Sequence, residues 1–267
     1  MAGQLAADYP FFDHPGPVPM AHRGGAHYAP NIGLENSLTA FGNAVAAGYR
    51  YLETDVHASR DGALFAFHDA TLGRMTGADG QIRSLDAAVV RRARIGGREP
   101  IPYLRELFDA FPQALFNIDV KEDEAVQPLV SLIQDTEAHD RVCIASFSTA
   151  RLRKLRAQLG PRVATSLGST EVAAMRLSPV PGRRGAGVAP GGTCAQVPHR
   201  AGPIRVVTER FIVQAHRGGL PVHVWTVNDA DEMRTLLDRG VDGLITDRLD
   251  VLRDVLTERG QWYGADP

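Results

Sequence analysis

The stretch YRYLETDVHASRDGALFAFHDATLGR, residues 49–74, places two acids and two histidines among short apolar runs. Its β-rich part, RYLETDV (50–56), continues through SRDG into a second apolar run, LFAFH (64–68). Asp61-Gly62 supplies a turn between the two runs, so we expect a strand that folds back on itself. Isolated buried acids are costly, so this strand also calls for a metal, a basic partner or a catalytic role.

β-rich runs alternate with helical patterns along the rest of the chain. Helical stretches such as 35–48 and 229–240 each end in a glycine, which suits the end of a helix. We expect strands at 18–22, 50–56, 64–68, 114–120, 141–146, 162–167, 194–198, 221–227 and 242–247. About eight repeats of strand and helix predict a (β/α)8 TIM barrel, with a doubly wound open sheet as the alternative.

Two segments interrupt this alternation. Residues 70–102 have few periodic apolar positions, so we expect a short insertion after the second strand. Residues 179–192, PVPGRRGAGVAPGG, are rich in glycine and proline and predict a mobile surface loop. No linker stands out, so we expect one domain over residues 1–267, with the barrel core at about 18–257.

Composition excludes several classes of partner. The formal net charge of −2 gives no electrostatic footprint for nucleic acid or an anionic membrane. We therefore expect no nucleic acid partner and no stable membrane insertion. The first residues do not show a basic run followed by an apolar run, so a cytoplasmic location is expected. Cys143 and Cys194 are too few for a disulfide framework and are expected to be buried thiols.

The acids of the first stretch share one face of their strand. Strand side chains alternate, so Glu53 and Asp55 point one way and the apolar residues between them point the other. In a barrel the acids would face the interior near the carboxyl end of the strand. Their oxygens are hard ligands suited to Mg²⁺ or Ca²⁺. The structural alternative is an ion pair with a nearby arginine.

The run FNIDVK (116–121) repeats this arrangement. Asn117, Asp119 and Lys121 lie on one face, which adds a third carboxylate and a lysine at the end of another strand. Three acids and a lysine suit a divalent cation together with an anionic substrate group. A buried pair between Asp119 and Lys121 is the competing, purely structural interpretation.

Histidines end two of the expected strands. His22-Arg23-Gly24 ends the first strand, at the rim where barrel enzymes keep their active sites. His68 ends the returning strand, and two histidines at one centre provide an acid and a base. We interpret His57 as a solvated turn residue and His223 as a core histidine with its hydrogen bonds satisfied.

Six motifs occur in order over about residues 18–257. They are AHRGG (21–25), ENSLTAF (35–41), YLETDVHASRDGALFAFHD (51–69) with LGRMTG (72–77), IPYLRELFDAFPQALFNIDVK (101–121), VWTVND (224–229) and GVDGLITDR (240–248). Together they resemble the glycerophosphodiester phosphodiesterase family.

The resemblance implies a metal-dependent TIM barrel that hydrolyses a small-molecule glycerophosphodiester to sn-glycerol 3-phosphate and an alcohol. The implied cofactor is a divalent cation, Mg²⁺ or Ca²⁺. Carried over position by position, the roles are acid and base for His22 and His68, metal ligands for Glu53, Asp55 and Asp119, lining of the phosphate and metal site for Arg23, Glu35, Asn36 and Lys121, and the substrate mouth for Trp225.

The chain departs from the family pattern at three places. The family commonly has Pro-Glu-Asn-Thr where residues 34–37 are Leu-Glu-Asn-Ser, after a longer loop, and it commonly has glutamate where Asp119 stands. The insertion over 70–102 is short for the family. Three other functions stay open: a phospholipase D-like hydrolase of lysophospholipids, a catalytically silent barrel that binds phosphorylated ligands, and a metal-independent phosphodiesterase. Self-association through the outer helices also stays open.

Overall fold

The computed structural model describes residues 5–178 and 191–264. Within these residues, eight parallel strands pair in the order β8-β7-β6-β2-β1-β13-β12-β9. Their bounds are Val18–His22 (β1), Tyr51–Ala58 (β2), Leu115–Val120 (β6), Val142–Ala145 (β7), Ala164–Thr165 (β8), Ala195–Pro198 (β9), Val222–Trp225 (β12) and Gly243–Thr246 (β13). A bridge between Ser166 and Cys194 joins the two ends of this row, so the sheet closes into a barrel.

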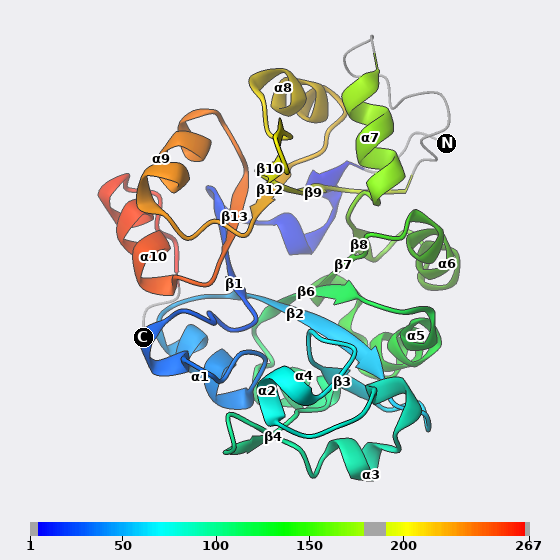
Figure 1. Cartoon of the computed structure of the whole chain (residues 1–267). Helices are drawn as coiled ribbons and strands as arrows, with labels where there is room; N and C mark the ends of the chain where they lie inside the picture. The colour runs from blue at the N-terminus through cyan, green and yellow to red at the C-terminus, as the bar shows by residue number, and fades with distance from the viewer. Residues whose placement is uncertain (1–4, 179–190, 265–267) are drawn as a thin grey trace.

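A helix follows each barrel strand, and the helices form a ring around the strands (Figure 1). They are α1 (Leu38–Ala46), α4 (Leu104–Ala110), α5 (Val126–Asp135), α6 (Thr149–Leu159), α7 (Ser169–Leu177), α8 (Glu209–Arg217), α9 (Ala230–Asp238) and α10 (Leu249–Glu258). Side chains of Ser37, Ser148, Thr208 and Asp229 accept hydrogen bonds from first-turn backbone N–H groups and so fix four of the helix starts. The predicted (β/α)8 barrel is confirmed, and the open sheet is excluded.

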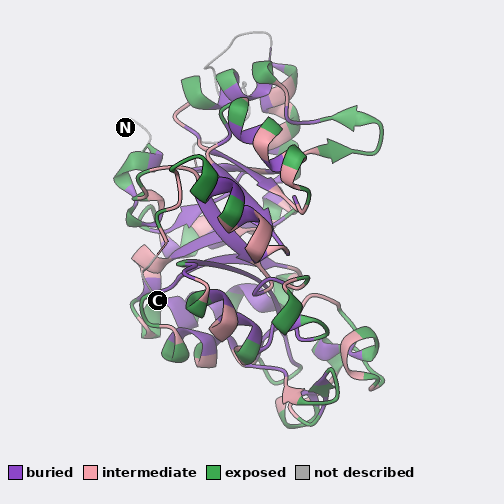
Figure 2. Cartoon of the chain, turned by 90° about the vertical axis from the view of Figure 1, so that its left-hand side faces the viewer, coloured by how far each residue is buried: buried purple, intermediate pink, exposed green. Residues whose placement is uncertain are grey.

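The core has an outer and an inner part. Alternating strand residues such as Leu52, Phe116 and Ile118 pack outward against the helices, and the strands are buried between the helical faces (Figure 2). The inner part is a smaller cluster that includes Met20, Tyr51, Leu115 and the two cysteines. Both cysteines are buried and free, as expected, with their sulfur atoms 3.8 Å apart.

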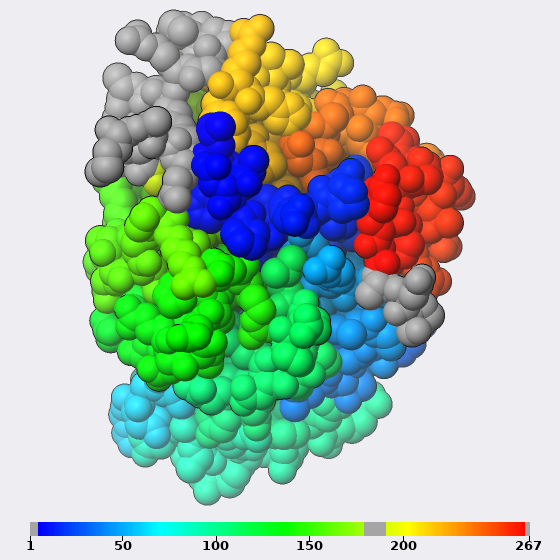
Figure 3. Space-filling view, turned by 180° about the vertical axis from the view of Figure 1, so that it is seen from behind, coloured from blue at the N-terminus to red at the C-terminus, as the bar shows by residue number. Residues whose placement is uncertain are grey.

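The N-terminal segment completes the inner core. Tyr9 and Phe11 belong to the inner cluster, and the Tyr51 hydroxyl donates a 2.9 Å hydrogen bond to the Phe11 carbonyl. The segment crosses the middle of the back of the molecule (Figure 3). Residues that precede the first strand therefore cover one end of the barrel, and the carboxyl ends of the strands lie at the other.

β2 turns back into β3 (Leu64–Ala66), which pairs antiparallel with it as the turn at Asp61-Gly62 predicts, and the insertion over residues 70–102 follows. It continues through α2 (Gly73–Thr76), α3 (Ala87–Val90), β4 (Arg94–Ile95) and β5 (Glu99–Pro100), below the barrel in Figure 1. Leu72, Ile82, Val90 and Ile95 give it a small apolar core of its own. The short insertion is confirmed, and the same cluster includes Leu34 and Ala40, so the insertion packs against the first helix of the barrel.

A second addition lies between β9 and α8. β10 (Arg200–Ala201) and β11 (Ile204–Arg205) form an exposed hairpin that projects from the barrel (Figure 2). Residues 179–190 of the predicted surface loop lie outside the described residues. None of the helices that the structure describes is long and apolar enough to cross a membrane.

Candidate active site

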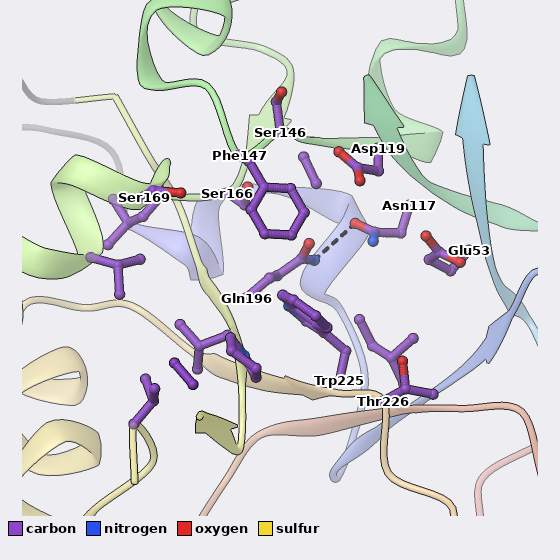
Figure 4. Close-up of a pocket in the computed structure, with 18 of the residues that line it drawn as sticks. Glu53, Asn117, Asp119, Ser146, Phe147, Ser166, Ser169, Gln196, Trp225 and Thr226 are labelled. Atoms are coloured by element: carbon purple, nitrogen blue, oxygen red, sulfur yellow. Dashed lines mark hydrogen bonds between the residues drawn. The ribbon is translucent and has the colours of Figure 1, made fainter. Parts of the chain in front are cut away.

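One pocket at the carboxyl ends of the barrel strands gathers most of the predicted site residues. It encloses about 470 Å³, and Figure 4 shows the side chains that line part of it. The predicted residues among its lining are His22, Arg23, Glu53, Asp55, His68, Asp119, Lys121 and Trp225. Glu35 and Asn36 lie behind this lining, where they contact its residues. The alternation argument therefore placed the β2 and β6 side chains correctly.

Three carboxylates form the centre of the pocket. Glu53 and Asp55 come from β2 and Asp119 from β6, and the strand register places Asp55 directly beside Asp119. All three residues are buried. Burial and the negative charge of Asp55 raise the pKa of Glu53 to about 7. Burial also raises the pKa of Asp119. The cluster is therefore costly to ionise and favours a nearby positive charge.

Lys121 and Arg23 supply part of that positive charge. The Lys121 ammonium lies 2.7 Å from Oδ1 of Asp55 and 2.6 Å from Oδ2 of Asp119. The Arg23 Nε lies 3.2 Å from the other oxygen of Asp55. Burial alone would raise the pKa of Asp55, but these two cations hold it below its usual range. The structural interpretation, a pair between Asp119 and Lys121, is thus present within the site.

The same donor set fits a divalent cation. Oδ1 of Asp119 is buried and has no hydrogen-bond partner. The oxygens of the three acids are the ligands that Mg²⁺ and Ca²⁺ prefer. Among the residues that the structure describes, no three His, Cys, Asp or Glu side chains are yet close enough together to hold one ion. A cation bound to Asp55 and Asp119 would therefore compete with the Lys121 ammonium.

His22 is held by a carboxylate that the sequence analysis did not single out. Its Nδ1 donates a 2.6 Å hydrogen bond to Oδ1 of Asp247, and Oδ2 of Asp247 accepts a 2.9 Å bond from Asn228. Its Nε2 lies 3.9 Å from Glu53. Burial lowers the pKa of His22, but the negative charges of Glu53 and Asp247 more than offset it, so the pKa is raised. Asp247 and Asn228 each follow a barrel strand, and this position in the sequence could have marked both as residues of the site.

His68 has its own carboxylate partner. Its Nδ1 donates a 2.6 Å hydrogen bond to Asp69, and Asp69 accepts another from Nε of Arg74 at 2.6 Å. Arg74, in α2 of the insertion, also donates a 2.6 Å bond to Glu35. Glu35 in turn accepts a 3.2 Å bond from Arg23. A chain of hydrogen bonds thus connects His68 to Arg23 through the insertion, and sequence reasoning missed Arg74.

Two buried residues support the site from behind. Asn36, which has a positive φ of 59°, donates a 3.4 Å bond to Asp55 and accepts a 2.8 Å bond from Thr54. His57 is buried on β2, and its Nε2 donates a 3.0 Å bond to the backbone carbonyl of His68. The expectation that His57 is a solvated turn residue is wrong, because β2 extends past it to pair with β3.

Other side chains correct or extend the expectations. His223 is a core residue as expected, but neither ring nitrogen has a hydrogen-bond partner, and burial lowers its pKa to about 4.

Phe147, which was not predicted, packs edge to face against Trp225 with ring centroids 5.6 Å apart. Figure 4 shows this pair beside Gln196, which donates a 2.8 Å bond to Asn117.

Comparison with known proteins identifies the family of this chain. Residues 22–251 match the family model described as the Glycerophosphoryl diester phosphodiesterase family. The chain belongs to this family. The "Probable glycerophosphodiester phosphodiesterase 2" of Mycobacterium tuberculosis (strain ATCC 25618 / H37Rv) is 41% identical over 257 residues, which cover 96% of each chain. The chain is therefore an enzyme, a phosphoric diester hydrolase of the glycerophosphodiester phosphodiesterase class.

Solved structures of family members share the barrel. An Oleispira antarctica phosphodiesterase in complex with the product sn-glycerol-3-phosphate is 22% identical, with a TM-score of 0.75, and the alignment covers 91% of this chain and 97% of that one. A glycerophosphodiester phosphodiesterase from Thermotoga maritima is 24% identical, with a TM-score of 0.70, covering 91% and 99%. These likenesses establish that the fold is common to the family.

Proposed function

We propose that this enzyme hydrolyses glycerophosphodiesters to sn-glycerol 3-phosphate and an alcohol, with His22 and His68 as the acid and base. The proposal includes a divalent cation, Mg²⁺ or Ca²⁺, held by Glu53, Asp55 and Asp119. The observation that carries it is the convergence of two histidine–carboxylate pairs and three buried carboxylates in one pocket. That combination supplies both proton transfer and charge neutralisation, which hydrolysis of a phosphodiester needs.

The histidine pairs suit proton transfer at the two apical oxygens of the phosphate. Each histidine uses Nδ1 to bind its carboxylate, Asp247 for His22 and Asp69 for His68. This leaves Nε2 to exchange a proton with a reacting oxygen. One histidine takes the proton of the attacking water or glycerol 2-hydroxyl, and the other protonates the leaving alcohol.

Positive charge around the phosphate comes from the chain and from the cation. Arg23 and Lys121 line the pocket beside the carboxylates and would neutralise the non-bridging phosphate oxygens. When bound, the cation supplies Lewis-acid polarisation of a phosphate oxygen. Lys121 would then leave the carboxylates it contacts now and turn to the phosphate. Glu35 and Asn36 hold Arg23 and Asp55 in position.

The test is release of glycerol 3-phosphate from glycerophosphocholine by the purified, EDTA-treated enzyme. We expect no release without metal and restored release with Mg²⁺ or Ca²⁺ added separately. Full activity in EDTA would overturn the role of the cation. No release with either ion, from a folded protein, would overturn the proposed substrate class.

Substitution of the two histidines tests their roles. His22→Ala and His68→Ala should each lower kcat by about 10²-fold or more, because each removes one proton transfer. His139→Ala is the matched control, since His139 lies in a short helical turn (Ala138–Arg141) and does not line the pocket. Thermal melting checks that each variant is folded. A near-wild-type rate in either active-site variant would contradict the assignment.

A further inference from the structure

Arg74 contacts two carboxylates that belong to different parts of the active site. Its side chain comes from α2 in the insertion, below the barrel in Figure 1. The guanidinium donates hydrogen bonds of 2.6 Å and 3.2 Å to Asp69 and of 2.6 Å and 3.0 Å to Glu35. A further bond goes to the sulfur atom of Met75, so each of its five N–H donors has an acceptor.

One nitrogen of Arg74 contacts the same carboxylate oxygens that hold two residues of the pocket. Nη2 contacts Oδ1 of Asp69, which also accepts the hydrogen bond from His68. The same nitrogen contacts Oε1 of Glu35, which also accepts the bond from Arg23. His68 and Arg23 line the pocket, but the other three residues do not. Arg74 therefore lies behind an acid/base group and a phosphate-binding group at once, without reaching the substrate.

Arg74 also supplies the positive charge between these two carboxylates. Burial would raise the pKa of Glu35 and of Asp69, but their hydrogen bonds to Arg74 help to hold both pKa values below the usual range. Both side chains therefore stay ionised and keep accepting hydrogen bonds from Arg23 and His68. A lysine could not replace Arg74, because an ammonium lacks the planar fork that pairs with a carboxylate through two bonds.

Close packing fixes the position of α2. Leu72 of the insertion and Leu34, which precedes Glu35, belong to the same apolar cluster. A Cβ atom at Gly96 of the insertion would come within 2.7 Å of the Gly33 carbonyl oxygen, so the two backbones meet without room for a side chain. The insertion is therefore packed against the loop that carries Glu35.

We propose that Arg74 is a positioning residue for the hydrolysis. By holding Asp69 and Glu35 at one guanidinium, it fixes His68 and Arg23 relative to each other, so that proton transfer and phosphate binding occur at one place. This inference rests on the proposed function for the roles of His68 and Arg23. The insertion then serves catalysis through Arg74, although none of residues 70–102 lines the pocket.

Removal and replacement of the guanidinium test this role. The Arg74 side chain is 47% exposed, so Arg74→Ala should fold and leave a gap that a small ion can enter. We expect kcat of the metal-loaded enzyme on glycerophosphocholine to fall by about ten- to a hundred-fold, because the reacting groups lose their alignment. Added guanidinium ion should raise this kcat several-fold, and methylammonium at the same concentration should not. Arg74→Lys should retain most of the loss for the same reason.

Arg60 provides the matched control. It forms the same kind of fork, with bonds of 2.9 Å and 2.6 Å to Asp86, but neither residue lines the pocket. Arg60→Ala should keep kcat within about two-fold of the wild type and should not respond to guanidinium. A double-mutant cycle tests the route: if Arg74 acts through Asp69, Arg74→Ala should cost less in an Asp69→Asn background than alone.

The proton on the His68 ring provides a measurement that needs no turnover. Long-range ¹H–¹⁵N spectra show which ring nitrogen carries the proton. In the wild type the bond to Asp69 favours the proton on Nδ1. In Arg74→Ala, Asp69 is no longer held against the ring, so part of the population should carry the proton on Nε2. Arg60→Ala should match the wild type.

The outcomes separate this inference from the proposed function. A wild type that cleaves no glycerophosphodiester would overturn the proposed function, and the His68 tautomer would still decide whether Arg74 positions that ring. A near-wild-type kcat in Arg74→Ala or in Arg74→Lys would overturn the inference. So would a loss that is fully additive with that of Asp69→Asn, or one that guanidinium does not restore while the His68 tautomer is unchanged.

Discussion

His22 and Asp247 are joined by a 2.6 Å hydrogen bond, although they stand 225 residues apart in the chain. The bond forms because β1 and β13 are neighbouring strands of the closed barrel. His22 is the last residue of β1, and Asp247 directly follows β13. Asn228 fixes the second oxygen of Asp247. This arrangement orients the His22 ring so that Nε2 faces Glu53.

Replacing Asp247 tests that orientation. Asp247→Asn keeps the size of the side chain, but its amide no longer favours the proton on Nδ1 of His22. We expect kcat for glycerophosphocholine to fall by about 10²- to 10⁴-fold while KM changes little. Asp242→Asn is the matched control, because Asp242 pairs with another histidine, His216, that does not line the active-site pocket. Equal losses in the two variants would contradict a specific role for Asp247.

Lys121 and the cation should compete for the same oxygens. Lys121→Met leaves Asp55 and Asp119 without their nearest positive charge, so the metal-free protein should lose about 3 kcal/mol of unfolding free energy. Added Ca²⁺ or Mg²⁺ should then raise Tm more in this variant than in the wild type. Differential scanning fluorimetry with and without EDTA measures both effects.

The chain's other lysine provides the control for that experiment. Lys154 also contacts a carboxylate, Asp123, at 2.6 Å, but it is exposed on α6. Lys154→Met should change stability by less than about 1 kcal/mol and should not alter the response to metal. A metal response in Lys121→Met that is no larger than in Lys154→Met would argue against competition at the carboxylate cluster.

His57 should act by positioning His68. His57→Ala removes the donor to the His68 carbonyl, and we expect kcat to fall on the order of ten-fold with KM little changed. His57→Gln retains an N–H at a similar reach and should recover most of the rate. Steady-state kinetics on the wild type and the two variants, with rates normalised to the concentration of folded protein, test this positioning role. If His57→Ala only destabilised the fold, the normalised kcat would stay at the wild-type value, and there would be no loss for His57→Gln to recover.

His223 should make the fold sensitive to acid. Its pKa is about 4 in the folded protein, against 6.5 when unfolded, so the unfolded state binds more protons between these values. The fold keeps its full stability above pH 6.5 and should lose up to about 3 kcal/mol from this group as the pH falls to 4. His223→Leu should lack this loss. Urea unfolding at pH 7 and pH 4.5 tests it, and parallel losses in both proteins would contradict it.

The strand positions, and most of the side chains that line the pocket, could be predicted because they depend on local patterns. In RYLETDV and FNIDVK, the alternation of strand side chains alone determines which residues share a face. As this alternation predicts, Glu53, Asp55 and Asp119 all line the pocket. His57 shows where local reasoning failed. Its environment depends on how far β2 runs beside β3, and the turn signal alone did not give that length.

The sequence by itself therefore determined the order of strands and helices, the faces of the strands and the family motifs. Only the tertiary structure decided which of these residues touch: His22 with Asp247, Lys121 between two acids, and Phe147 facing Trp225. Such contacts require the barrel to close, which brings together segments far apart in the chain through packing that no local pattern encodes.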